Sequence, residues 1–140
     1  MTTNTDLKEL RALGYNAPDY MAAMMACSPD CFKLLTPDGK IAYMSHNGRC
    51  VMEIDNLDDV LHQPWSALWP SEHKPLIEGA VTAAQDGKIA HFVAECPTAK
   101  GSPGRWDVTV MGIFSVTNAL IEIMAISRET DDPCRGLVVT

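Results

Sequence analysis

The sequence contains no long apolar run and no cluster of basic residues. No apolar stretch within its 140 residues reaches the length of a membrane span, and the N-terminus lacks the apolar core of a signal peptide. The eleven Lys and Arg residues are scattered in a chain of net charge −7, whereas binding to phosphates requires grouped cations. We therefore expect neither a membrane nor a nucleic acid as partner, and a cytoplasmic location.

The sequence also lacks the short motifs of common enzymes and metal sites. It has no G-x-S-x-G turn, phosphate-binding loop, H-E-x-x-H pair or kinase signature. Its five cysteines include no C-x-x-C pair, and their odd number argues against a closed set of disulfides. His46 and Cys50 could reach one ion, but two ligands do not make a zinc site. We therefore expect no catalytic residues, no metal and no enzymatic activity.

A strand, a turn and a second strand open the central part of the chain. Two apolar segments, Cys31–Leu35 and Ile41–Met44, flank a Thr-Pro-Asp-Gly sequence that is typical of a tight turn. Ser45 follows the second segment, and its hydroxyl can accept from the free amides of a helix that begins near His46. This pattern predicts a hairpin that leads directly into a helix, within a sheet that carries helices on one face.

Helical periodicity occurs on both sides of this hairpin. Before it, the pattern predicts one helix that ends at Gly14 and a second over residues 18–27, whose apolar stripe is rich in methionine. After it, the pattern predicts short helices over residues 47–54 and 57–61 and a longer helix over residues 71–86. Helices on both sides of a hairpin indicate a mixed α+β fold.

The period changes to two residues in the second half of the chain. Residues 89–96, 105–114 and 119–127 alternate as strands do, which makes five strands with the opening hairpin. The last of these strands is largely apolar on both faces, so we expect cover on both sides. The central helices would provide one cover, and the N-terminal helix or a second subunit the other. Residues 131–140 show no pattern of a folded element and are compatible with disorder.

Four segments of the chain carry a family resemblance, namely SPDCFKLLTPDGKIAYMS, HQPWSALWP, CPTAKGSPGRWDVTV and IMAISRET. Taken in order, they resemble a bacterial sensor PAS domain, and the resemblance extends over residues 28–130. It implies an α+β fold with a five-stranded antiparallel sheet, short helices on one face, and a helical flank over residues 1–27. Ser45 stands where the family usually has asparagine, although serine can still cap a helix. The resemblance leaves open whether the chain is an excised sensor domain or a single-domain protein.

The resemblance implies a sensor of signal transduction, in which a small ligand or a redox cue acts in an internal pocket. The signal would pass to a histidine kinase or another regulator. Each pocket candidate is also explained by core packing alone. The candidates are the inward strand positions and the facing helix positions, namely Phe32, Leu34, Met52, Trp69, Ile77, Phe92, Val108 and Ile123.

The alternative is a ligand-free PAS module for dimerisation or docking. Its surface would combine the methionine-rich N-terminal helix with the outer face of the sheet, and a homodimer is expected in either case. Methionine side chains adapt easily to a partner surface. The candidate contact residues are Tyr20, Met21, Met24, Met25, Met124 and Ile126.

The resemblance leaves the cofactor open. Haem-binding members use a histidine of the long helix, and His73 lies in the first turn of that helix, where an exposed or capping role is favoured over an axial ligand. Flavin-binding members that form a cysteine adduct use an Asn-Cys-Arg sequence. Here the order is Gly48-Arg49-Cys50 and the segment lies in a different helix, so we expect no adduct and interpret Cys50 as a small buried apolar residue.

Overall fold

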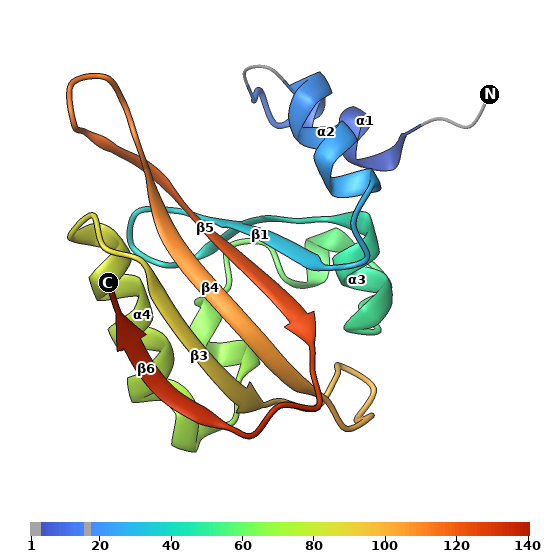
Figure 1. Cartoon of the computed structure of the whole chain (residues 1–140). Coiled ribbons are helices and arrows are strands. Elements are labelled where there is room, and N and C mark those ends of the chain that lie inside the picture. Colours follow the sequence, from blue (N-terminus) through green and yellow to red (C-terminus); the bar gives the residue numbers. More distant parts are fainter. Residues whose placement is uncertain (1–3, 16–17) are drawn as a thin grey trace.

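The computed structural model describes residues 4–15 and 18–140, and its centre is one antiparallel sheet (Figure 1). The sheet has six strands in the order β2-β1-β5-β4-β3-β6, and every neighbouring pair is antiparallel. The strands are β1 (Cys31–Leu35), β2 (Ile41–Met44), β3 (Ala90–Glu95), β4 (Arg105–Phe114), β5 (Leu120–Glu129) and β6 (Arg135–Val139).

Four α-helices accompany the sheet in the part of the chain that the structure describes. Ser45 caps α3 as predicted, because its side chain accepts a hydrogen bond from the Gly48 backbone N–H. The helix predicted to begin at Ser71 begins later, since residues 71–73 form a single 3₁₀ turn. The helices are α1 (Thr5–Ala12), α2 (Pro18–Ala26), α3 (His46–Val51) and α4 (Lys74–Gln85), with 3₁₀ turns at Leu57–Asp59, Trp65–Leu68 and Ser71–His73.

The predicted hairpin turn is present between β1 and β2. Gly39 has a φ of +88°, a conformation that glycine adopts without steric cost, and its N–H donates to the Thr36 carbonyl at 2.8 Å. The turn brings the two strands into antiparallel pairing, with Leu34 opposite Tyr43. The hairpin prediction is therefore confirmed in both its turn and its strands.

The two faces of the sheet carry separate cores. On one face, α4 buries Ile77, Ala80 and Ala84 against inward side chains of the strands. On the other face, α1 and α2 bury Leu10 and Met25 against β1 and β2. Figure 1 shows these two helices beside β1 and α3, whereas α4 lies behind β3 and β6. Cover on both faces explains why the last predicted strand is apolar on both sides.

The C-terminal segment forms a sixth strand, which corrects the predicted five-stranded sheet and the expectation of a tail without structure. β6 pairs with β3, with Val139 opposite Ala90 and Val138 opposite His91. Every residue of β6 is exposed, so the strand buries little and has no clear amphipathic pattern. It forms because β3 would otherwise leave its edge hydrogen-bonding groups unpaired, a tertiary cause that local periodicity does not reveal.

No helix within residues 4–15 and 18–140 combines the length and the apolar character needed to cross a membrane.

Candidate functional site

A small enclosed cavity lies between the sheet and the helical turns that precede α4. Its volume is about 10 Å³, which is room for about one water molecule. Strands β1, β2, β4 and β5 contribute one side, and the segment around Trp65–Leu68 contributes the other. The cavity is lined by Lys33, Met44, Met52, Trp65, Leu68, Trp69, Cys96, Trp106 and Ser127.

The unusual group in this lining is Lys33, whose residue surface is only 4% exposed. In β1 it follows the buried Cys31 and precedes the buried Leu35, so the alternation of the strand directs it toward the main core. Its Nζ donates to the Ser127 hydroxyl at 3.0 Å and lies 5.9 Å from the centre of the Trp65 ring. No Asp or Glu among the described residues forms an ion pair with this ammonium.

Aromatic rings form the wall opposite the sheet. Trp65 and Trp69 meet edge to face at 6.2 Å, and both lie against Phe92, at 6.5 and 5.6 Å. Pro64 and Pro70 bracket the short turn that carries the two tryptophans, which keeps it from extending as a helix. The Trp65 indole nitrogen is buried and has no hydrogen-bond partner among the described residues.

Cys96 provides the thiol of the cavity. Burial raises the pKa of this thiol, and the Lys33 ammonium lowers it by a smaller amount. The sulfur lies 3.3 Å from the Leu68 carbonyl oxygen, to which the thiol donates. Because only a thiolate is a strong nucleophile, the raised pKa makes Cys96 a polar lining residue and not a reactive one.

A cleft on the surface adjoins the cavity. It has a volume of about 380 Å³, and Trp106 and Ser127 line both it and the cavity. At its rim the Arg128 guanidinium pairs with the buried Asp30 at 2.9 Å. Trp106 and Ser127 therefore lie between the cavity and this surface cleft.

The structure places six of the eight predicted pocket residues on the cavity side of the sheet. Met52 and Trp69 line the cavity itself, and Ile77, Phe92, Val108 and Ile123 belong to the core around it.

Phe32 and Leu34 were wrongly assigned to the pocket, because they face α1 and α2 on the other side of the sheet. The charge of Lys33 suggests that its side chain points to solvent. Because side chains alternate along a strand, that interpretation directs Phe32 and Leu34 toward the main core. The sequence prediction thereby missed Lys33, together with Trp65, Cys96, Trp106 and Ser127. A signal for Lys33 was available in the strand Cys31–Leu35. Lys33 alternates with Cys31 and Leu35, so its side chain lies on the same face as these two buried residues.

The predicted dimer residues divide between surface and core. Tyr20 and Met24 are 78% and 61% exposed on α2. Met25, by contrast, is 2% exposed and packs under α1, so its assignment to a dimer surface is wrong. Met21 and Met124 are half-buried against the same core, and Ile126 is half-buried in β5.

The structure places the two cofactor candidates outside the cavity lining. His73 ends the 3₁₀ turn before α4, and its ring meets Trp69 edge to face at 6.3 Å. Cys50 is exposed on α3, which corrects the expectation that it is buried. Within residues 4–15 and 18–140, no three His, Cys, Asp or Glu side chains gather as a metal ion would require.

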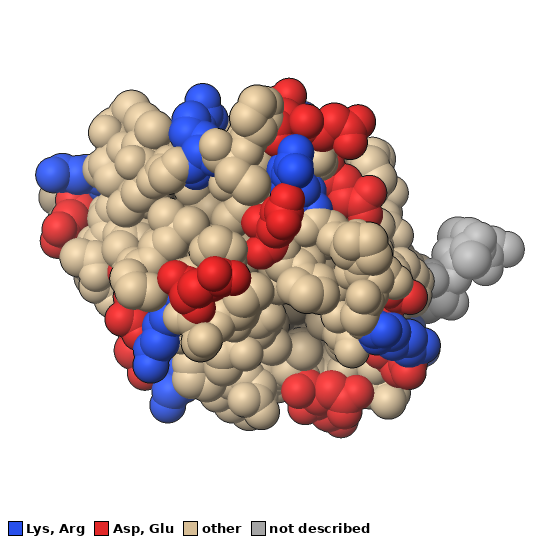
Figure 2. Space-filling view, turned by 90° about the horizontal axis from the view of Figure 1, so that it is seen from below, with Lys and Arg blue, Asp and Glu red and all other residues tan. Residues whose placement is uncertain are grey.

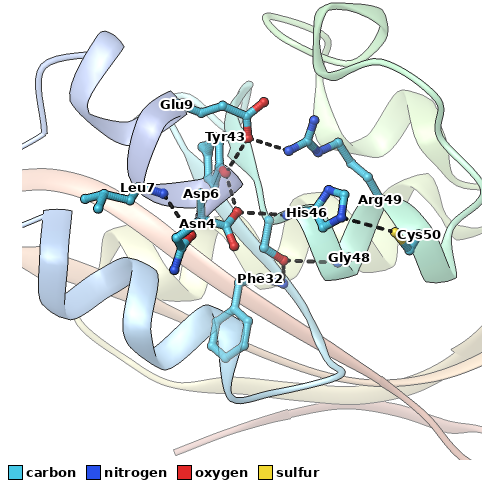
Figure 3. Close-up of polar contacts among 11 residues, drawn as sticks. Asn4, Asp6, Leu7, Glu9, Phe32, Tyr43, His46, Gly48, Arg49 and Cys50 are labelled. Carbon is cyan, nitrogen blue, oxygen red and sulfur yellow. Dashed lines mark hydrogen bonds and ion pairs between the residues drawn. The ribbon is translucent and has the colours of Figure 1, made fainter. Parts of the chain in front are cut away.

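A polar network ties the N-terminal flank to the elements that border the cavity (Figure 3). The Tyr43 hydroxyl in β2 donates to Asp6 of α1 and lies 2.8 Å from a carboxylate oxygen of Glu9. Asp6 also accepts from the His46 backbone N–H at 2.8 Å, and Glu9 pairs with Arg49 of α3. Tyr43 itself packs in the core under α1 and α2, on the other face of the sheet from the cavity. Its neighbour Met44 in β2 lines the cavity, as does Met52, which directly follows α3.

This network predicts a loss of stability at alkaline pH. Burial, followed by hydrogen bonds to Asp6 and Glu9, raises the pKa of Tyr43 well above its ordinary value. An unfolded tyrosine ionises near pH ~10, whereas native Tyr43 stays protonated there. The native state then binds more protons, so the free energy of unfolding falls as pH rises above about 10.

We expect Tyr43→Phe to reduce this decline by an amount that grows from pH ~10 and approaches about 1.4 kcal/mol per pH unit near pH ~11, the limiting contribution of one proton. Urea unfolding at a series of pH values between about 8 and 11 measures the decline. The exposed Tyr20 allows a matched control, Tyr20→Phe, which should leave the decline unchanged. Equal slopes for Tyr43→Phe and the unmodified protein would contradict the prediction.

Figure 2 shows the molecule from below the view of Figure 1. Acidic and basic side chains are interspersed on this face, between wide areas of other residues. The face drawn there carries no continuous basic surface of the kind that binds nucleic acid phosphates.

The six-stranded sheet, the helices that cover it and the small cavity between them define an α+β domain with an internal cavity. A family model described as PAS fold matches residues 26–132. The chain therefore belongs to the PAS family. A search of curated proteins finds no match to it.

Solved structures support the same fold. A PAS domain from Colwellia psychrerythraea is 14% identical with a TM-score of 0.69, covering 82% of this chain and 98% of its own. A PAS domain of an HTR-like protein from Haloarcula marismortui is 17% identical with a TM-score of 0.63, over 80% and 98%. A domain of a sensory box sensor histidine kinase/response regulator from Geobacter sulfurreducens is 12% identical with a TM-score of 0.65, over 79% and 91%.

Proposed function

We propose that this chain is a sensor module of bacterial signal transduction, which binds a small molecule in the internal cavity and relays its presence to a regulator. The observation that carries the proposal is the composition of the cavity lining. A core that only packs would place apolar side chains there, since a buried polar group without a partner is costly. This lining instead contains the Lys33 ammonium, the unpaired Trp65 N–H and the Cys96 thiol.

A ligand in the cavity has a short path to the N-terminal flank. Met44 and Met52 would contact it directly, and each is close in sequence to a residue of the network in Figure 3, Tyr43 in β2 and Arg49 in α3. Displacement of either methionine would alter how Tyr43 and Arg49 hold Asp6 and Glu9. The ligand shifts the flank only if it binds the two arrangements with different affinity.

The regulator would be a histidine kinase or another output protein, joined to this domain or docked on it. The structural relative from a Geobacter sulfurreducens sensor histidine kinase supports this class of partner. A homodimer through α2 is compatible with the exposure of Tyr20 and Met24. A cytoplasmic location and the absence of enzymatic activity complete the proposal.

Thermal-shift screening of a metabolite library tests the proposal, together with native mass spectrometry of the purified protein. A ligand that binds only the folded protein raises the unfolding temperature. The variant Ser127→Leu adds bulk to the cavity lining, and Ser71→Leu, at an exposed position of the 3₁₀ turn before α4, is its control. We expect a hit to stabilise the unmodified protein and Ser71→Leu but not Ser127→Leu. Hits that stabilise all three equally, or a library without hits, would count against an internal ligand site.

The alternative is a ligand-free module for dimerisation or docking, and the small size of the cavity favours it. Its surface would be α2, where Tyr20 and Met24 are exposed. Native mass spectrometry distinguishes the two functions. A dimer without any retained small molecule, combined with a screen without hits, supports the alternative.

A further inference from the structure

We propose that the internal site binds a small organic monocarboxylate with an apolar or aromatic body, and that Lys33 is its charge partner. This inference rests on the proposed sensor function and names the chemical class of its ligand. Three features carry it: the unbalanced charge of Lys33, the surplus of hydrogen-bond donors, and the aromatic wall of the cavity.

The first feature is the charge. Lysine is almost never fully buried without a partner, because burial removes its ammonium from water. Lys33 is 4% exposed, and its one polar contact in the described part of the chain is the neutral Ser127 hydroxyl. A hydroxyl satisfies one N–H and supplies no negative charge. An anion in the cavity would provide the charge that the protein itself does not.

The second feature is the direction of the free hydrogen bonds. An ammonium has three donors and no acceptor, and Ser127 uses one of them. The indole N–H of Trp65 is a further donor without a partner, on a residue that also lines the cavity. The Trp106 N–H is already bonded to the Cys96 carbonyl oxygen at 2.9 Å. The groups that lack hydrogen-bond partners are therefore donors. A carboxylate can accept hydrogen bonds on both of its oxygens.

The third feature is the character of the remaining wall. Besides these polar groups, the lining consists of tryptophan rings, Leu68 and the flexible side chains of Met44 and Met52. Such a wall suits an apolar or aromatic body and disfavours a strongly hydrated dianion such as phosphate. A single ammonium also balances a single negative charge. Since the cavity holds only about 10 Å³, binding must displace side chains, and methionine adapts most readily.

The experiment compares benzoate and phenylacetate with the neutral probes benzamide and phenylacetamide. Thermal shift and NMR titration are measured for the unmodified protein, Lys33→Met and Lys33→Arg. We expect the carboxylates to bind the unmodified protein and to move the Trp65 indole N–H signal, which Trp65→Phe identifies among the three tryptophans. Lys33→Met should weaken the carboxylates at least about tenfold, as loss of a charged hydrogen bond does. Lys33→Arg should restore part of this affinity.

The outcomes separate the two proposals. Binding of the amides with equal or higher affinity than the acids would overturn the carboxylate inference and leave the sensor function intact. Equal carboxylate affinity in Lys33→Met would overturn the role of Lys33 in the same way. A third outcome is that none of the four probes binds while the library screen finds only neutral or cationic ligands. That outcome would overturn the carboxylate inference and leave the sensor function intact. If a variant fails to fold, an unmoved Trp65 signal in the unmodified protein overturns it.

Discussion

Replacing Lys33 with methionine is expected to stabilise the ligand-free protein by about 1–4 kcal/mol, on the scale found when buried ion pairs give way to well-packed apolar residues of similar volume. Methionine matches the length of the lysine stem and lies among Trp65, Met44 and Leu68 without a charge to solvate. The lost bond to Ser127 offsets part of the gain, by about 1 kcal/mol. The gain in stability would accompany a loss of ligand response, which is typical of a site maintained for function.

Urea unfolding of Lys33→Met measures this effect directly. The matched control is Lys40→Met, because Lys40 is exposed and its nearest carboxylate, in Asp38, lies 3.9 Å away. The control should change the free energy of unfolding by less than about 1 kcal/mol. A clear destabilisation by Lys33→Met would show that the ammonium contributes to the fold, and the argument for an unbalanced charge would fail.

Replacing Arg49 with methionine is expected to destabilise the protein by about 3 kcal/mol, the lower end of the range for breaking a buried ion pair. The Arg49 side chain is 9% exposed and that of its partner Glu9 is 25% exposed, so solvent compensates only part of the loss. The variant leaves the Glu9 carboxylate with Tyr43 as its remaining hydrogen-bond partner among the described residues. We expect α1 to separate from β2 and α3 more often than in the unmodified protein.

Urea unfolding gives the total cost, and hydrogen exchange of the α1 amides tests where it arises. Arg11→Met is the matched control, because Arg11 pairs with Asp19 on the surface, at 3.2 Å and with both side chains more than half exposed. The control should cost less than about 1 kcal/mol. In a double-mutant cycle, Arg49→Met and Glu9→Gln should couple by more than about 0.5 kcal/mol. Additive effects, or unchanged exchange in α1, would contradict a connection through this pair.

Local chemistry made the central unit predictable. The Thr-Pro-Asp-Gly turn places Gly39 at a positive φ, and Ser45 caps α3, because both features depend on residues only a few positions apart. The strands β4 and β5 were also predictable, since each is ten residues long and alternates in burial over part of its length. The family resemblance depends in part on these same segments, the hairpin and the strands β4 and β5.

Which alternate side chains of β1 face the main core was not predictable from the residues of this strand alone. In the run Cys31–Leu35 the apolar residues lie on both sides of Lys33, so either set of alternate positions could face the main core. The charge favours an outward Lys33, and only the pairing of β1 with β5 shows that it faces inward to Ser127. Lys33, the most informative residue of the candidate site, is therefore the residue that its charge wrongly assigned to the outer face of the sheet.

The sequence by itself determined the order of the elements, the hairpin turn, the capped helix and the membership of the α+β class, because these follow from neighbouring residues. Only the tertiary structure decided that Arg135–Val139 is a strand, that Lys33 is buried, and that Tyr43 connects α1 to the border of the cavity. These three features have the same physical reason. Each depends on contacts between residues distant in the chain, and the free energy gained from those contacts outweighs the local conformational preference of the residues.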